Sequence, residues 1–184
     1  MIKKLSVFII ILGGILIGIY SCERDDLCPE TTQTTASVVI ETFDALDPEQ
    51  NKNVFGLRIQ GIDNDEVLEG YDVVSSGSLV LPLRTDADET QYRLHQDYEV
   101  DDNDTPDDPS DDIFLGNEDI ITITYIREDV YVSRACGYKT VYNNVRIVLQ
   151  DDSVDTDQWI NRIQAENDNQ IVENEAETHF KLFH

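Results

Sequence analysis

The chain has 184 residues, of which 38 are acidic and 13 basic, so its formal net charge is −25 at pH 7. This negative surplus argues against a nucleic-acid-binding protein and against adsorption to anionic lipid. It fits a soluble domain held off an outer surface, or one that gathers divalent cations. The length suits one domain with a sizeable core.

The N-terminal residues have the pattern of a secretory signal. Two lysines precede an apolar run over residues 5–19, which is too short for a comfortable membrane-spanning helix. The sequence IYSC at residues 19–22 resembles the bacterial lipobox, which ends in the cysteine that is modified. The resemblance implies that residues 1–21 are removed and that Cys22 carries a diacylglycerol thioether. An uncleaved N-terminal anchor is the alternative.

Acylation of Cys22 would determine where the protein is located. Two or three acyl chains, at about 0.8 kcal/mol per buried methylene, hold a protein on a bilayer essentially permanently. Arg24 followed by Asp25 and Asp26 resembles the signals that route such lipoproteins to the outer face, although ordinary solvation of a linker is an alternative. We therefore expect a protein of the cell envelope that is lipid-anchored to the outer membrane. Whether it faces the periplasm or the cell surface is left open.

If the lipid occupies Cys22, two cysteines remain, Cys28 and Cys136. An even pair in an oxidising compartment predicts a disulfide. Closing a loop of about 100 residues would stabilise the fold by up to about 4.7 kcal/mol in the chain-entropy model. The rival interpretation is a reactive Cys136 near a histidine, which a count of free thiols would test.

Two-residue alternation of apolar side chains dominates the rest of the chain and predicts strands. The runs are residues 37–43, 54–60, 78–84, 120–126, 129–134, 144–150 and 178–184. Residues 157–165 fit a short helix or a strand, and the strand is preferred. Turn-forming clusters separate the runs, which is typical of an all-β fold. We expect a single antiparallel β-sandwich domain, immunoglobulin-like or similar, over residues 37–184.

The alternation also predicts which side chains face inward. In the second run Phe55, Leu57 and Ile59 share one face, and in the fourth run Ile121, Ile123 and Tyr125 do so. In the third run Leu79, Leu81 and Leu83 alternate with Val80, Pro82 and Arg84. Pro82 predicts an edge strand or a bulge, because proline has no N–H to donate to a sheet.

Two segments have no such pattern. Residues 22–36 contain the lipidated cysteine and a threonine-rich tether. Residues 97–112 contain nine acidic side chains and two prolines, which predicts a mobile surface loop. Its dense oxygen donors make it the best candidate for a calcium site. The candidate ligands are Asp101, Asn103, Asp104, Asp107 and Asp108. The glycine and the final glutamate of an EF-type loop are missing, so a solvated acidic insert without a cofactor is preferred.

No set of residues with the spacing of a catalytic site is found in the sequence. The stretch SSGS at residues 75–78 indicates a turn, and no Gly-x-Ser-x-Gly motif exists. His179 and His184 are five residues apart, so on one strand they would point to opposite faces, and His95 would have to come from elsewhere. Glycoside hydrolysis needs a pair of carboxylates at a specific separation, and acidic residues are too abundant in this chain for their presence to indicate such a pair. We therefore expect a protein that is not an enzyme.

Basic residues are few, but Arg134 and Lys139 flank Cys136, with Tyr131 and Tyr138 nearby. Such a cluster indicates either an internal, packed ion-pair node or a surface that faces a partner. The packed interpretation is preferred, because the neighbourhood of a disulfide is normally packed.

Several pieces of the chain resemble a family of Bacteroidota lipoproteins of unknown function. They are CERDDLC at 22–28, LVLPLRTDADETQYRL at 79–94, VSRACGYKT at 132–140, DQWINRI at 157–163 and THFKLFH at 178–184. The VSRACGYK piece is the most specific. The resemblance implies an envelope location and the β fold, and it implies no catalytic residue.

The sequence thus predicts a non-enzymatic binding or structural protein of the envelope. Its expected partners are the membrane, through the lipid anchor, and an envelope protein or a glycan. A calcium- or glycan-dependent module that uses residues 97–112 is the alternative.

Overall fold

The computed structural model describes residues 27–150 and 157–184. These residues form two compact units. The larger comprises Gln33–Asp129 and Thr140–His184, and the smaller comprises residues 27–32 and Val130–Lys139. Nearly all regular structure in the described ranges is β-strand, and none of their helical residues form a segment long and apolar enough to cross a membrane.

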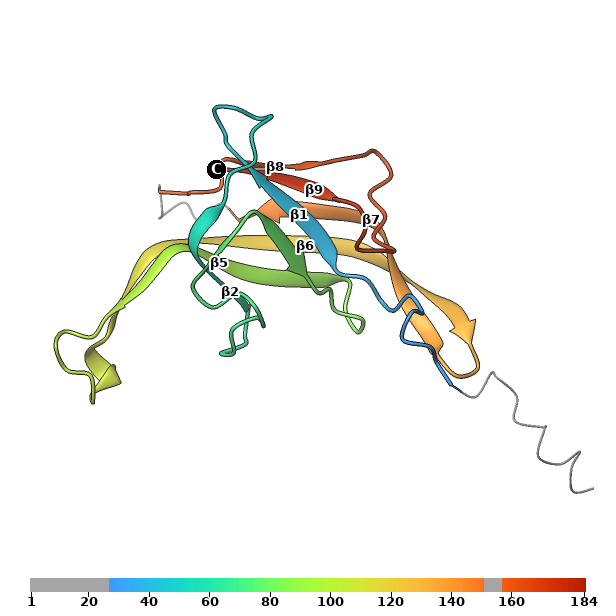
Figure 1. The fold of residues 1–184 in the computed structure, drawn as a ribbon, viewed down its shortest axis with the longest axis horizontal. Coiled ribbons are helices and arrows are strands. Elements are labelled where there is room, and N and C mark those ends of the chain that lie inside the picture. The colour runs from blue at the N-terminus through green and yellow to red at the C-terminus, as the bar shows by residue number, and fades with distance from the viewer. Residues whose placement is uncertain (1–26, 151–156) are drawn as a thin grey trace, which may run out of the picture. The chain divides into compact units, whose positions relative to one another are not determined.

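The larger unit is built from two sheets (Figure 1). One has four strands in the order β4-β1-β9-β8, and the other has five in the order β3-β2-β5-β6-β7. The strands are β1 (Val38–Phe43), β2 (Val54–Gly61), β3 (Val74–Ser76), β4 (Ser78–Leu81), β5 (Glu89–Asp101), β6 (Ile113–Ser133), β7 (Gly137–Leu149), β8 (Arg162–Ala165) and β9 (Phe180–Phe183). β1 and β9 run parallel, whereas β1 with β4, β8 with β9, β2 with β3 and with β5, and β5 with β6 run antiparallel. The predicted all-β sandwich is confirmed.

The core lies between the two sheets and is made by the alternating apolar residues of both. The fully buried side chains include Val38, Ile40, Leu57, Ile59, Leu79, Leu81, Leu94, Ile121, Ile123, Tyr142, Ile160 and Leu182. Burial of one such aliphatic side chain contributes about 1.5–3 kcal/mol. The inward faces predicted for residues 120–126 and 78–84 are therefore confirmed. Pro82 directly follows β4, which is an edge strand as predicted.

The predicted inward face of β2 is wrong at one position. Phe55 is 60% exposed, whereas Val54 and Leu57 are completely buried. The pairing of β2 with β3 shifts register between Val54 and Leu57, and Gly56 between them has φ +55°. A β-bulge of this kind adds one residue to the strand and turns the preceding side chain to the other face.

Residues 157–165 are a strand only in their last four positions, which form β8. Before it, Trp159 and Ile160 are buried and anchored by hydrogen bonds. The indole Nε1–H of Trp159 donates to the carbonyl of Leu94 at 3.3 Å, and the backbone N–H of Ile160 donates to Asp119 Oδ2 at 2.7 Å. Trp159 and Ile160 are therefore held by side-chain contacts, and the backbone bonds to β9 begin at Asn161, whose N–H donates to the carbonyl of Phe183 at 2.8 Å.

The end of the predicted tether is bound to the larger unit. The backbone N–H of Thr140 donates to Thr35 Oγ1 at 2.9 Å, and the side chain of Ala36 is only 6% exposed. Residues 28–36 contain no strand, in agreement with the sequence.

The predicted acidic loop begins later than residue 97, because residues 97–101 continue β5. Glu99 pairs with Leu115, Val100 with Phe114 and Asp101 with Ile113. The loop itself covers residues 102–112 and contains one short 3₁₀ turn, Pro109–Asp111. We call residues 98–115 the arm, and its yellow-green ribbon extends past the end of β2 in Figure 1.

The arm begins at a bulge between Gln96 and Glu99, where Asp97 has φ +51°. A glycine lies on each side of this bulge. A Cβ atom on Gly56 of β2 would lie 2.8 Å from the Cα of Asp97, and a Cβ atom on Gly116 of β6 would lie 2.6 Å from the carbonyl oxygen of Gln96. The three backbones approach so closely that only glycine fits at these two positions.

We predict that Gly116→Ala destabilises the fold by about 2–4 kcal/mol, because it adds a steric clash to the strain of a positive φ. The matched control is Gly70→Ala, since Gly70 also has a positive φ of +84° but no atom lies within 4 Å of the position that its Cβ would take. This control should lose about 1 kcal/mol. Urea unfolding measures both, and equal losses would contradict the close approach at the bulge.

Candidate functional site

The arm presents apolar side chains to solvent. Phe114 is 65% exposed and Val100 is 42% exposed. These two are paired across the hairpin, so they share one face, and Tyr98 lies on that face two residues before Val100. The rings of Tyr98 and Phe114 are stacked, with centroids 6.2 Å apart and an interplanar angle of 21°. Ile113 and Leu115, 48% and 43% exposed, flank Phe114.

Negative charge surrounds this apolar face. The loop at residues 102–112 carries six aspartates, and residues 97–117 contain no lysine or arginine. Most side chains of the loop are exposed. The arm therefore combines a solvent-facing aromatic and aliphatic surface with a strongly negative border.

The root of the arm holds Tyr98 in place. The guanidinium carbon of Arg58 lies 4.6 Å from the centroid of the Tyr98 ring, and the His95 ring meets it edge-on at 5.2 Å. His95 Nε2 is 2.8 Å from Glu118, which also lies 3.1 Å from Arg93. Burial lowers the pKa of His95; Glu118 opposes this, while Arg93 and Arg58 add to it. His95 Nε2 thus lies within hydrogen-bonding distance of the Glu118 carboxylate.

The residues predicted as calcium ligands lie in and beside the same loop, where carboxylates cap turns. Asp101 Oδ1 accepts the backbone N–H of Asn103 at 3.0 Å, and Asp108 Oδ1 accepts from the backbone and the hydroxyl of Ser110. In the same way, the backbone N–H of Asp104 donates to Asp102 Oδ1 at 3.1 Å. Asp107 also lies in this loop and is exposed. Within residues 27–150 and 157–184, no group of three or more acidic, histidine or cysteine side chains is arranged to hold a metal ion.

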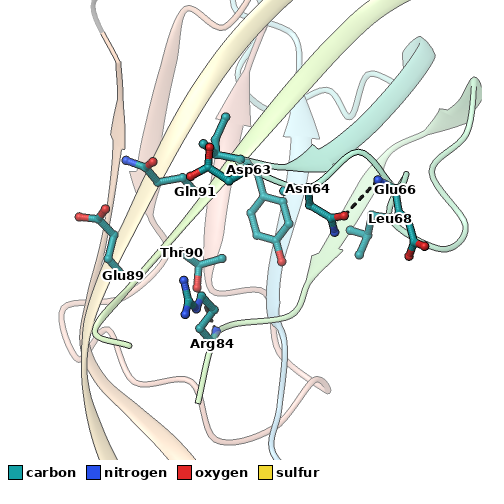
Figure 2. Close-up of a pocket in the computed structure, with 11 residues that line it drawn as sticks. Asp63, Asn64, Glu66, Leu68, Arg84, Glu89, Thr90 and Gln91 are labelled. Carbon is teal, nitrogen blue, oxygen red and sulfur yellow. Dashed lines mark hydrogen bonds between the residues drawn. The ribbon is translucent and has the colours of Figure 1, made fainter. Parts of the chain in front are cut away.

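A second candidate is an open cleft of about 470 Å³ beside the start of β5 (Figure 2). Some of its polar groups are bonded within the chain. Thr90 Oγ1 accepts the backbone N–H of Arg84 at 2.9 Å and lies 2.7 Å from the hydroxyl of Tyr125. Asn64 Oδ1 accepts the backbone N–H of Glu66, as the dashed line shows. These bonds shape the wall and the adjoining turn. The lining residues are Gly61, Ile62, Asp63, Asn64, Glu66, Leu68, Arg84, Glu89, Thr90, Gln91 and Tyr92.

The serines of the SSGS stretch have a structural role. Ser76 Oγ donates to the carbonyl of Ser78 at 2.6 Å and also lies 3.2 Å from its backbone nitrogen. This arrangement closes the turn between β3 and β4, as expected from the sequence.

The three histidines bind separate partners. His179 Nδ1 accepts the backbone N–H of Val39 at 2.9 Å, and His184 Nε2 lies 3.2 Å from the carbonyl oxygen of Lys52. His95 contacts a carboxylate on β6 at the root of the arm. These contacts fix three different places in the fold.

The smaller unit contains the predicted disulfide. Cys28 and Cys136 are joined, with Cα atoms 4.9 Å apart and a sequence separation of 108 residues. The backbone N–H of Cys136 donates to Ser133 Oγ at 3.0 Å, which orders the turn between β6 and β7. The rival interpretation of Cys136 as a free thiol does not hold in this structure. The predicted lipid attachment residue, Cys22, lies outside the described residues.

The packed interpretation of the cluster around Cys136 is wrong. Tyr131 and Tyr138 are 58% and 68% exposed, with their rings 5.4 Å apart in an edge-to-face arrangement, and Arg134 is exposed. Two-stranded hairpins leave both faces open unless another layer covers them, and sequence alternation alone does not reveal such a layer.

Sequence reasoning also missed the aromatic face of the arm. Residues 97–101 are mostly acidic, and this composition predicts a loop although Tyr98 and Val100 alternate with the acidic residues. The available signal was the run Ile113, Phe114 and Leu115 directly after the acidic segment, which a solvated loop does not need.

Fold and surface together define a β-sandwich protein with an acidic, aromatic-faced arm and a disulfide-bonded hairpin. The chain belongs to a family of unknown function, DUF6452, which it matches over residues 56–184. Neither a curated protein nor a solved structure matches it.

We predict that protonation of His179 destabilises the fold. Burial lowers its pKa, and the neighbouring Glu177 and Glu175 oppose this. The unfolded chain, with a histidine pKa of about 6.5, therefore takes up protons first as the pH falls, and the free energy of unfolding drops below that pH. His179→Asn keeps an acceptor for the backbone N–H of Val39 and does not titrate. The free energy of unfolding of this variant should therefore fall less steeply than that of the wild type between about pH 6.5 and pH 5.

Denaturant unfolding at a series of pH values measures this difference. Above about pH 7 the free energies of unfolding of the wild type and of His179→Asn should change with pH in parallel, because the histidine is neutral in both the folded and the unfolded state. Parallel curves down to the lowest pH would contradict the assignment of Nδ1 as a necessary acceptor.

Proposed function

We propose that the protein is a lipid-anchored component of the bacterial cell envelope, and that its β-sandwich domain binds a partner and does not catalyse a reaction. The lipobox-like residues before Cys22 support the anchor, and the length of the apolar run supports a cleaved signal. The VSRACGYK piece supports a Bacteroidota lipoprotein family. The outer membrane is the proposed location.

The exposed face of Tyr98, Val100 and Phe114 is the observation that carries the binding role. Soluble proteins seldom leave neighbouring large apolar side chains in solvent, and such patches with polar borders commonly mark interaction sites. Arg58 and His95 hold the Tyr98 ring, and Phe114 stacks on that ring, so this part of the face is ordered without a partner. Preorganisation of this kind reduces the entropy cost of binding.

The border of the face indicates what kind of partner fits. An aromatic and aliphatic centre within a negative rim is complementary to a protein surface that has an apolar depression surrounded by lysine or arginine. The partner proposed here is therefore another envelope protein with a basic surface. Stacked aromatic rings also suit the apolar face of a sugar, which makes a glycan the second candidate.

The anchor is tested at Cys22. We predict that Cys22→Ser stops processing at the full-length precursor, because a hydroxyl does not accept the diacylglycerol group that a thiol does. The precursor can still remain on the inner membrane through residues 5–19, so membrane fractionation does not separate the two outcomes. The mass of the N-terminal peptide decides: an unmodified peptide that begins at Met1 in the wild type would contradict the lipoprotein assignment.

The binding role is tested by capture from detergent-solubilised envelope with the wild type, Phe114→Ser and Phe55→Ser. The control Phe55 is similarly exposed, at 60% against 65%, but lies on β2 outside the arm. We expect Phe114→Ser to lose the captured protein and Phe55→Ser to retain it, identically in calcium and in EGTA. Loss in both variants, or no reproducible protein, would count against the arm. Capture only in calcium would favour the calcium-dependent alternative.

A further inference from the structure

The smaller unit differs in surface character from the rest of this acidic chain. Leu27 is 81% exposed, and Tyr131 and Tyr138 are 58% and 68% exposed. The last two belong to the turn region of the β6–β7 hairpin, residues 130–139, which we call the tip. The disulfide from Cys28 to Cys136 joins residues 27–32 to the tip.

The charge of these residues has the opposite sign to that of the chain. The tip contains Arg134 and Lys139 and no acidic residue, and residues 27–32 contain only one, Glu30. Thirteen basic residues stand against 38 acidic ones in the whole chain, so this local positive balance is unusual. Glu128 and Asp129 directly precede the tip, and Asp129 accepts a hydrogen bond from Thr140. The repulsion that more distant carboxylates exert is screened beyond about 8 Å at physiological salt.

The sequence also limits how far the tip can be from the lipid. Cys28 follows Cys22 by only six positions, and a fully extended chain of that length spans about 20 Å. The disulfide adds a Cα–Cα distance of 4.9 Å. If Cys22 is acylated, as the proposed function requires, Cys136 is held within about 25 Å of the acylated residue.

We propose that the tip is a membrane-contact site that binds the phospholipid headgroup region of the bilayer in which the Cys22 lipid is inserted. Tyr131 and Tyr138 have the apolar body and polar end that place tyrosine at membrane–water interfaces. Arg134 lies in the same short segment, is exposed, and suits headgroup phosphates. This inference rests on the proposed lipid anchor and adds a second, protein-mediated contact to it.

The test places a fluorescent reporter at the tip of the processed protein, which begins at the acylated Cys22. The variant Tyr138→Trp is reconstituted into vesicles of phosphatidylethanolamine and phosphatidylglycerol, with and without brominated acyl chains. The chain's own tryptophan, Trp159, is buried and supplies a constant background that the wild type measures. Bromine quenches indole at short range, so the added signal should lose most of its intensity in brominated vesicles. In vesicles without bromine the added signal should shift to the blue, because the indole enters less polar surroundings.

Phe55→Trp is the matched control, since Phe55 is exposed to a similar extent on β2 and lies outside the disulfide-bonded segment. Its added signal should be unaffected by brominated lipid. Tyr131→Trp repeats the measurement if Tyr138→Trp does not fold. Equal quenching of the tip and control variants, or no quenching at the tip, would overturn the membrane contact.

Two further measurements separate this inference from the proposed anchor. Adding Cys28→Ser and Cys136→Ser to Tyr138→Trp should abolish the quenching while the protein remains on the vesicles through its lipid. The mass of the N-terminal peptide is determined in every sample. An acylated protein without quenching at the tip overturns this inference alone, whereas an unmodified N-terminus overturns the anchor and this inference together.

Discussion

The antiparallel pairing of β5 with β6 supports both the core of the larger unit and the arm. Along the paired strands on the core side, Leu94, Ile121 and Ile123 face the opposite sheet and are completely buried. On the other side of the bulge at Asp97, the same two strands leave β2 and continue as a two-stranded arm. The close approach of three backbones at that transition is possible only because Gly56 and Gly116 have no side chain.

The difference between the buried part of β5 and β6 and the arm explains which parts of the fold could be predicted from sequence. Residues 121–125 alternate strictly because one face of β6 is buried, so the period of two is imposed by the core. The same rule failed at Phe55, because the bulge at Gly56 adds a residue that no hydrophobic pattern reports. Residues 97–101 were missed for another reason. Tyr98 and Val100 do alternate there with acidic residues, but the acidic composition of the whole segment predicts a loop.

The candidate site was predictable to a different extent. The disulfide followed from the number of cysteines and the expected compartment, since both are inferred from the sequence. The exposure of Tyr131 and Tyr138 did not, because it depends on whether another layer covers the hairpin. The acidic loop was correctly located from residue 102 onward, but its composition says nothing about where each carboxylate points. Asp101 and Asp108 accept hydrogen bonds from nearby backbone N–H groups, which is the usual behaviour of aspartate in turns.

The disulfide also determines how mechanical load passes through the molecule. Cys28 and Cys136 close a covalent ring that contains β1 through β6. A pull on the N-terminal end is transmitted through the sulfur atoms directly to the hairpin of β6 and β7. When the opposing force acts at the C-terminal end, the disulfide bypasses the backbone between the two cysteines. The first β-strand, which pairs in parallel with the C-terminal strand β9, therefore carries no tension from a pull between the two ends of the chain.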